Sequence, residues 1–248
     1  MKRNSYWRLA IVYRLSPSHL IHTMKAKAIL ALIALTSGTL AVSGAEFDQA
    51  VNELIPKLAD AKVENRYAAQ MHLQDLMSAA TKPGQDADRL ALSKVLAGRA
   101  GDSSVPQPAR VWIVRQLEYM GHGEAVAALT KVLQGDDAEL RECARRALEK
   151  NPDPTAGASL RAALKNDSDT SWKIGLIHSL GERRDAESAK LIAAQLNDIA
   201  VASAAAKALG QIATPTAVDA LWSVLSRNRF AGEALIDDVS VIELPNGA

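Results

Sequence analysis

Aromatic residues and cysteines are scarce in this chain. Only 4% of its 248 residues are aromatic, and Cys143 is the single cysteine. One cysteine excludes an internal disulfide, and with it a small fold held together by disulfides. Cys143 lies in the run 140–144, whose pattern is helical and where a small half-buried residue fits. We interpret it as a packing residue, because a buried cysteine behaves as a small hydrophobic side chain.

Motifs with a defined catalytic mechanism are also missing. The chain contains no glycine-rich phosphate loop, no Gly-x-Ser-x-Gly sequence and no His-Glu-x-x-His sequence. After residue 45 there are only three histidines, His72, His122 and His178, which stand far apart in the sequence. Isolated histidines on different units rarely converge on a metal ion, so we expect no metal site and no cofactor.

Acidic residues are absent from residues 1–45, which carry six basic ones. The formal charge of the whole chain is +1, but the part after residue 45 has 23 basic and 28 acidic residues, a net charge of −5. A mildly acidic surface repels phosphate groups. We therefore expect no nucleic-acid partner.

The basic N-terminal region has the pattern of a secretory signal peptide read from an internal start. Met24 begins a short basic stretch, residues 28–35 are apolar, and small residues occupy 43–45. This order predicts Met24 as the true initiator, cleavage after Ala45, and export to the periplasm or the exterior. The alternative is an uncleaved membrane anchor, but the apolar run is shorter than the roughly 20 residues that span a bilayer. We expect no membrane span after cleavage.

Before the last dozen residues the sequence has no runs rich in Val, Ile and Tyr, which are typical of strands. Leucines instead recur in pairs 16 residues apart. The pairs are Leu117 with Leu133, Leu148 with Leu164, Leu180 with Leu196, and Leu209 with Leu225. A short break follows the first leucine of each pair, at 121–123, 151–154, 181–185 and 213–215. A fixed interval with an internal break predicts helical hairpins that bury their apolar faces against one another. The predicted fold is an all-α solenoid of stacked antiparallel helix pairs.

A ladder of basic residues emerges when the second helices of the hairpins are aligned on their leucines. The basic residues, each seven positions before a leucine, are Arg66, Arg110, Arg141 and Lys173. Positions three, four and seven apart share one side of a helix, so the ladder lines one face of the stack. Trp112 lies two residues beyond Arg110 and would form a binding hot spot beside it. We name these five residues as candidates for protein binding; the alternative is that the cations pair with turn acids and brace the stack.

The segment 137–148, Asp-Ala-Glu-Leu-Arg-Glu-Cys-Ala-Arg-Arg-Ala-Leu, resembles the second helix of a HEAT repeat of the short bacterial, phycobilisome-lyase-like type. The Leu-Gly-Glu run at 180–182 and the Leu-Gly-Gln run at 209–211 are similar to the turn into the following unit. The resemblance covers about five hairpins and implies a right-handed superhelix that binds proteins through its concave face. Phycobilin lyases act in the cytoplasm, where an exported protein has no substrate, so we do not carry that activity over.

The sequence divides into a leader (1–45), a solenoid (46–228) and a tail (229–248) expected to be extended. The first units depart from the repeat, with loops expected at 81–86 and 97–108. The predicted function is an exported HEAT-repeat scaffold that binds a protein partner and has no catalysis of its own. The alternative is an enzyme, or an accessory subunit of one, whose site is built from several repeats. The partner and the oligomeric state stay open.

Overall fold

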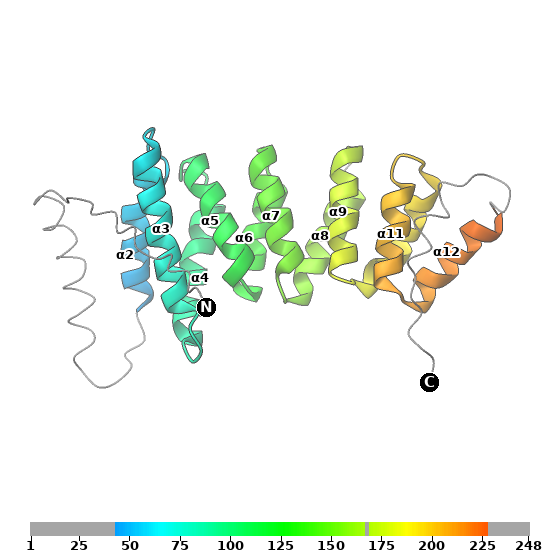
Figure 1. The fold of residues 1–248 in the computed structure, drawn as a ribbon, viewed down its shortest axis with the longest axis horizontal. Coiled ribbons are helices and arrows are strands. Elements are labelled where there is room, and N and C mark those ends of the chain that lie inside the picture. The colour runs from blue at the N-terminus through cyan, green and yellow to red at the C-terminus, as the bar shows by residue number, and fades with distance from the viewer. Residues whose placement is uncertain (1–42, 167–168, 228–248) are drawn as a thin grey trace, which may run out of the picture. The chain divides into compact units, whose positions relative to one another are not determined.

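The computed structural model describes residues 43–166 and 169–227, which form a succession of helices with no strand among them (Figure 1). In chain order the helices are α2 (Gly44–Leu58), α3 (Val63–Ala80), α4 (Asp86–Gly101), α5 (Gln107–Met120), α6 (Gly123–Leu133), α7 (Ala138–Lys150), α8 (Pro154–Asn166), α9 (Thr170–Glu182), α10 (Ala189–Ala193), α11 (Ala202–Ile212) and α12 (Pro215–Arg227). Two 3-10 turns, η1 (Ala186–Ser188) and η2 (Ala194–Asn197), flank α10. The predicted signal peptide, except for its last three residues, and the predicted tail lie outside the described residues.

The helices are arranged in two layers. Consecutive helices contact each other as pairs: α2 with α3, α4 with α5, α6 with α7, α8 with α9, and α10 with α11. The odd-numbered helices also contact the next odd-numbered ones, α5 with α7 and α9 with α11 most extensively, and α4 contacts α6 in the even-numbered layer. An array in which each unit mainly contacts its neighbours is an α-solenoid, so the predicted fold class is confirmed.

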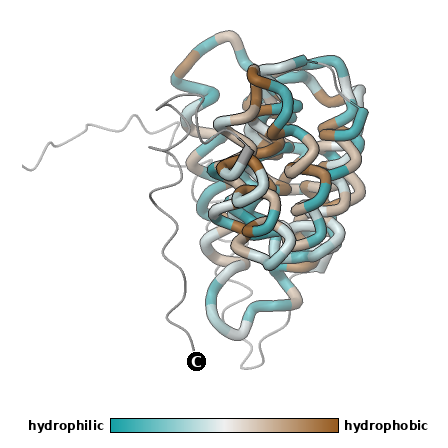
Figure 2. Tube along the Cα trace, turned by 90° about the vertical axis from the view of Figure 1, so that its right-hand side faces the viewer, coloured by the Kyte–Doolittle hydropathy of each residue, from teal (hydrophilic) through white to brown (hydrophobic). Residues whose placement is uncertain are grey.

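The core lies between the two layers and contains most of the recurring leucines. Six of the eight are buried: Leu117, Leu133, Leu148, Leu164, Leu180 and Leu209. Leu196 and Leu225 are half-buried. Each buried leucine contributes roughly 1.5–3 kcal/mol of hydrophobic stabilisation. Figure 2 shows hydrophobic and hydrophilic residues interleaved along the helices, as expected for helices with one buried face.

The helix ends follow the breaks in the sequence. The four predicted breaks coincide with the ends of α5, α7, α9 and α11. Asp137 and Asp169 begin α7 and α9, and each carboxylate accepts a hydrogen bond from a backbone N–H in the first turn, at 2.8 and 2.7 Å. Such capping satisfies donors that have no partner within the helix. None of the helices in the described part is long and apolar enough to cross a membrane.

One predicted loop is wrong in its extent. The loop at 81–86 is present, since α3 ends at Ala80 and α4 begins at Asp86. The second loop, expected over 97–108, spans only 102–106, because α4 continues to Gly101. Ala97 and Ala100 are buried in the core, and this packing keeps the segment helical despite its two glycines.

Candidate protein-binding groove

A groove of about 840 Å³ crosses α3, α5 and α7 on the odd-numbered layer. Each helix lines it with residues at positions i, i+3, i+4 and i+7, which is one face of two helical turns. These are Gln74, Met77 and Ser78 from α3, with Thr81 directly after its end; Trp112, Arg115, Gln116 and Tyr119 from α5; and Glu139, Glu142, Cys143 and Arg146 from α7. Glu118 of α5 completes the lining.

Polar and apolar side chains both lie deep in the groove, since Gln116 and Glu118 of its lining are buried. Met77 and Trp112 are partly buried against the core, and Cys143 is 7% exposed. Tyr119 stands at the opposite extreme, 72% exposed on the same face of α5 as Trp112. Aromatic side chains such as Trp112 and Tyr119 are enriched among the residues that dominate the binding energy of protein–protein interfaces.

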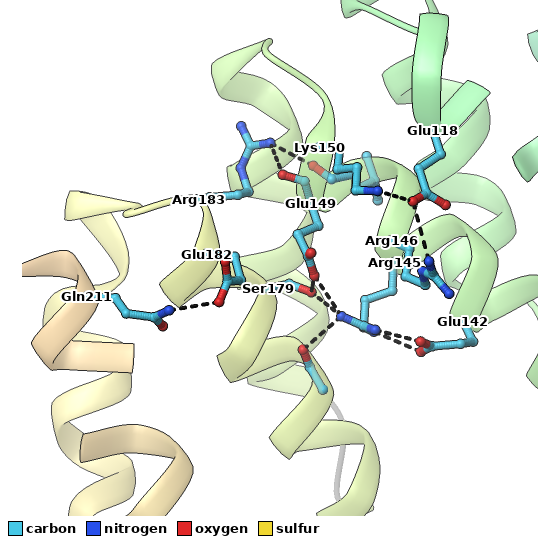
Figure 3. Close-up of polar contacts among 12 residues, drawn as sticks. Glu118, Glu142, Arg145, Arg146, Glu149, Lys150, Ser179, Glu182, Arg183 and Gln211 are labelled. Atoms are coloured by element: carbon cyan, nitrogen blue, oxygen red, sulfur yellow. Dashed lines mark hydrogen bonds and ion pairs between the residues drawn. The ribbon is translucent and has the colours of Figure 1, made fainter. Parts of the chain in front are cut away.

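A buried carboxylate joins the groove walls of α5 and α7. The Glu118 side chain is 4% exposed, and its Oε1 lies 3.5 Å from Arg146 Nη2. The same oxygen accepts a hydrogen bond from Lys150 Nζ, and this bond raises the pKa of Lys150 (Figure 3). Lys150 Nζ also lies 5.3 Å from the centroid of the Tyr119 ring. The buried Glu118 carboxylate therefore pairs with two cations, Arg146 and Lys150, whose side chains are about half exposed.

A second ionic cluster joins α7 to α9 beside the groove. The Arg145 guanidinium, 11% exposed, contacts Glu142 and Glu149 on its own helix. It also donates to the backbone carbonyl of Gly175 at 3.2 Å and to the hydroxyl of Ser179 (Figure 3). Burial lowers the pKa of Arg145, but the two carboxylates outweigh it and leave that pKa above its ordinary value. This cluster fixes one groove-lining helix against its neighbour.

Side chains at the ends of the odd-numbered helices reach back by one repeat. Asn151, which ends α7, is 2% exposed and donates to the carbonyls of Gly121 and His122 at 3.1 and 2.9 Å. Arg183, which ends α9, occupies the equivalent position, and burial lowers its pKa. Its guanidinium donates to four carbonyls at the end of α7, those of Leu148, Glu149, Asn151 and Asp153. Each side chain thereby bonds to backbone carbonyls at or just beyond the end of the previous odd-numbered helix, where some carbonyls have no partner within the helix.

The even-numbered layer has its own pair of bridges. Arg89 of α4 lies 2.7 Å from Glu124 of α6 and donates to the carbonyl of Met120 at 3.0 Å. Burial raises the pKa of Glu124, but the Ser93 hydroxyl and the Arg89 guanidinium outweigh it, and the pKa falls to about 2. Arg161 of α8 likewise pairs with Asp185 and Glu187, which open the next unit.

Of the five residues predicted to bind a partner, only Trp112 lines the groove. Arg66 donates to the carbonyls of Asp60 and Ala61, and Arg110 donates to that of Ala100. These two arginines thus bond to backbone carbonyls near the end of the preceding helix, where the alternative interpretation expected acid side chains. Arg141 stacks on the Trp172 ring, 4.4 Å from its centroid, and Lys173 is half-buried on α9. The part of all five residues in binding a partner stays a prediction.

Tyr119 and Arg146 were missed in the sequence. A signal was present: Tyr119 follows Trp112 by seven residues, and Arg146 follows Glu139 by seven, so each pair shares a helix face. What the sequence did not show is that these faces adjoin across three helices. Within the described residues, no group of three or more His, Cys, Asp or Glu side chains is placed to hold a metal ion.

Stacked helix pairs, bridges from each unit to the next and a groove across successive second helices define an α-solenoid repeat protein. A family model for HEAT repeats matches residues 100–181 and 159–234, which together make up more than half of the chain. The chain therefore belongs to the HEAT repeat family, whose members are generally protein-interaction scaffolds. No curated protein matches it.

Proposed function

We propose that this chain is an exported scaffold that binds a protein partner through the groove on α3, α5 and α7, and that it performs no catalysis itself. The observation that carries the proposal is the groove, which combines partly buried Trp112 and Met77 with exposed Tyr119. Tyrosine and tryptophan are enriched among residues that dominate binding energy, and Trp112 lies in the same lining.

The neighbouring surface supports this location. Tyr67 and Met71 on α3 are 63% and 40% exposed, one helical turn apart, and precede the groove-lining Gln74. Large exposed apolar side chains next to a groove extend the area that a partner can cover. Methionine adapts its shape to different partners, and tyrosine adds contact area with a polar tip.

A pull-down with the full chain, tagged at its C-terminus and read by mass spectrometry, tests the proposal. Wild type is expected to recover a protein partner from the exported fraction of the native cell. Tyr119→Ala should lose it, because this exposed ring contributes to the groove and little to the core. Trp222→Ala is the matched control, since Trp222 is 69% exposed on α12, which contributes nothing to the groove lining. Equal recovery with both variants would refute the assignment of the groove.

Lys173→Ala tests the basic ladder separately. A loss of the same partner with Lys173→Ala would extend the interface from α7 to α9, and full retention would limit it to the groove. Helix content and thermal unfolding, followed by circular dichroism, establish that each variant is folded.

Export has its own test in the N-terminal sequence of the protein from fractionated cells. The proposal expects a chain that begins at Glu46 in the exported fraction. A chain that retains residues 24–45 in the cytoplasm would overturn export and leave the binding proposal standing.

A further inference from the structure

We propose that residues 233–244 of this chain pack on the exposed face of α12 and complete the hairpin that α12 begins. The inference concerns a surface outside the groove lining and does not depend on the proposed function. Three observations carry it: the position of α12 in the array, the cover that the same face has in an earlier repeat, and the apolar spacing of the residues that follow α12.

The last described helix lacks the partner that its position in the array implies. Each earlier even-numbered helix, from α2 to α10, packs against the odd-numbered helix that follows it. In contrast, α12 contacts α10 and α11, which precede it, and ends the described part of the chain (Figure 1). Because a hairpin buries apolar residues between its two helices, a first helix by itself leaves part of its apolar surface uncovered.

The uncovered surface of α12 is a row of three apolar side chains, which we call the α12 stripe. Val218 and Leu225 are half-buried, and Trp222 is 69% exposed. The three residues stand at positions i, i+4 and i+7, so they share one side of the helix. Covering a large aromatic side chain such as that of Trp222 removes about 150–250 Å² from water, so this stripe favours an apolar occupant.

An earlier repeat shows the same face in its covered state. Both α8 and α12 begin with Pro-Thr-Ala, and in this register the α12 stripe corresponds to Gly157, Arg161 and Leu164 of α8. Gly157 and Leu164 are buried, and the Arg161 side chain is 15% exposed. The face of α8 is therefore covered where the face of α12 is not.

The cover at the position of Trp222 comes from the unit that follows. In α8 the corresponding residue is Arg161, which pairs with Asp185 at the start of the next unit, at 2.6 Å. In α6 it is Thr130, whose hydroxyl lies 2.7 Å from that of Ser159 in α8. By the same rule, the residues that cover Trp222 are expected after the end of α12.

The residues after α12 have the apolar spacing of a second helix. Three odd-numbered helices bury apolar residues at positions i, i+1 and i+4: Ile113, Val114 and Leu117 in α5; Leu176, Ile177 and Leu180 in α9; and Ala205, Ala206 and Leu209 in α11. Leu235, Ile236 and Val239 repeat this spacing, and Ile242 extends it by almost one turn. An extended chain, expected from the sequence for residues 229–248, would divide these four side chains between its two faces. The spacing therefore favours a helix.

The segment also has the length and the attachment that the missing helix needs. Three to five residues separate the two helices of each hairpin from α2 to α9, and five residues, 228–232, separate α12 from the segment. Its 12 residues are close to the 13 of α7 and of α9, and Pro245 follows it, as is common after a helix end. Because it is joined to α12, it meets the stripe at an effective concentration in the millimolar range. A second copy of the chain has no such advantage.

Fluorine NMR of the full chain, labelled with 5-fluorotryptophan, tests the proposal. The change in chemical shift between H2O and D2O measures the exposure of each ring, and Trp222→Phe assigns the Trp222 resonance. The chain unfolded in urea supplies the value for full exposure. We expect Trp222 in the folded chain to show less than half of this value. A ring that stays 69% exposed, as on α12 without cover, would show more than half.

Two valine variants distinguish a helix from an extended chain. Val239→Asp puts a charge on the apolar side of the proposed helix and should raise the isotope shift of Trp222 above half of the unfolded value. Val241→Asp is the matched control, because residue 241 lies on the other side of a helix, and it should leave Trp222 as in wild type. The resonances of Trp112 and Trp172, which pack against the core, serve as the internal reference for folding.

The other possible occupants give different results. A Trp222 ring that is exposed in wild type would overturn the proposal. Shielding that disappears on dilution would assign the stripe to a second copy of the chain, and shielding that Val239→Asp leaves unchanged would assign it to another part of the chain. An effect of Val241→Asp as large as that of Val239→Asp would indicate an extended segment, in which both valines share one face. Each of these results contradicts the proposed hairpin.

Discussion

Replacing Glu124 with glutamine measures how strongly one inter-repeat ion pair holds the stack. The Glu124 side chain is 10% exposed and lies 2.7 Å from Arg89. Its pKa in the folded chain is about 2, against an ordinary value of 4.5. A carboxyl group with a lowered pKa stabilises the fold above pH 4.5, and that stabilisation is lost as the pH falls from 4.5 towards 2.

The magnitude follows from the fall in the pKa of Glu124 from 4.5 to about 2. At 1.36 kcal/mol per unit, the upper bound is about 3.4 kcal/mol at neutral pH. Solvent reaches part of the pair and glutamine can still accept a hydrogen bond, so we expect Glu124→Gln to lose about 2 kcal/mol at pH 7. By pH 3 the difference from wild type should fall by more than half, because the unfolded carboxyl is then almost fully protonated.

Urea unfolding followed by circular dichroism at pH 7, 5, 4 and 3 gives these differences. Glu139→Gln is the matched control, since its pair with Arg115 is about half exposed on both sides and is worth less than about 1 kcal/mol. A loss of the same size at every pH would show that Glu124 acts through packing alone. No loss at pH 7 would refute the ionic contribution altogether.

Four further substitutions give expected changes in the free energy of unfolding, each measured by urea denaturation. Asn151→Ala removes two donated hydrogen bonds and leaves buried carbonyls without them, so it should cost about 2–3 kcal/mol; a loss below 0.5 kcal/mol would mean that water replaces the amide. Gly181→Ala places a Cβ 2.9 Å from the Cα of Ala208 and should cost about 1–3 kcal/mol. Gly98→Ala, with nothing within 4 Å of the added Cβ, should instead stabilise α4 by up to about 1 kcal/mol. Ala213→Gly should stabilise by about 1 kcal/mol, because Ala213 ends α11 at φ 51° and ψ 29°, a left-handed conformation that favours glycine; a decrease would contradict this.

The fold was predictable because its signals are local. Leucines 16 residues apart, with a break inside each interval, depend on one hairpin at a time, and the hairpins are where they were expected. The extent of the loop at 97–108 failed because buried Ala97 and Ala100 outweigh the helix-breaking tendency of Gly98 and Gly101. Packing between helices decides whether such a segment is helical, and the helix propensities of its residues alone do not predict that packing.

The site was predictable only in part. Trp112 was identified from its own position, but the groove depends on which faces of α3, α5 and α7 adjoin, and this is set by inter-repeat bridges. Lys150 to Glu118 is one such bridge, and Arg145 to Ser179 is another. Their partners lie 32 and 34 residues apart, about one repeat, and no local pattern of charges specifies the pairing. The partners of Arg66 and Arg110 were not predictable for the same reason, since backbone carbonyls as partners leave no trace in the sequence, and the part of these arginines in binding stays a prediction.

The start of α2 has a consequence for how the protein would mature. Ser43 caps this helix in a reciprocal arrangement with Glu46: the Ser43 hydroxyl accepts from the Glu46 N–H at 3.3 Å, and the Glu46 carboxylate accepts from the Ser43 N–H at 2.9 Å. Cleavage after Ala45 would cut between these two residues. It would remove a cap worth about 1 kcal/mol and put a positive ammonium group where the helix dipole favours negative charge. A peptidase would meet its bond most readily before α2 forms, so under the proposed processing removal of the leader precedes folding of the first repeat, and the mature protein has a weaker first helix than its precursor.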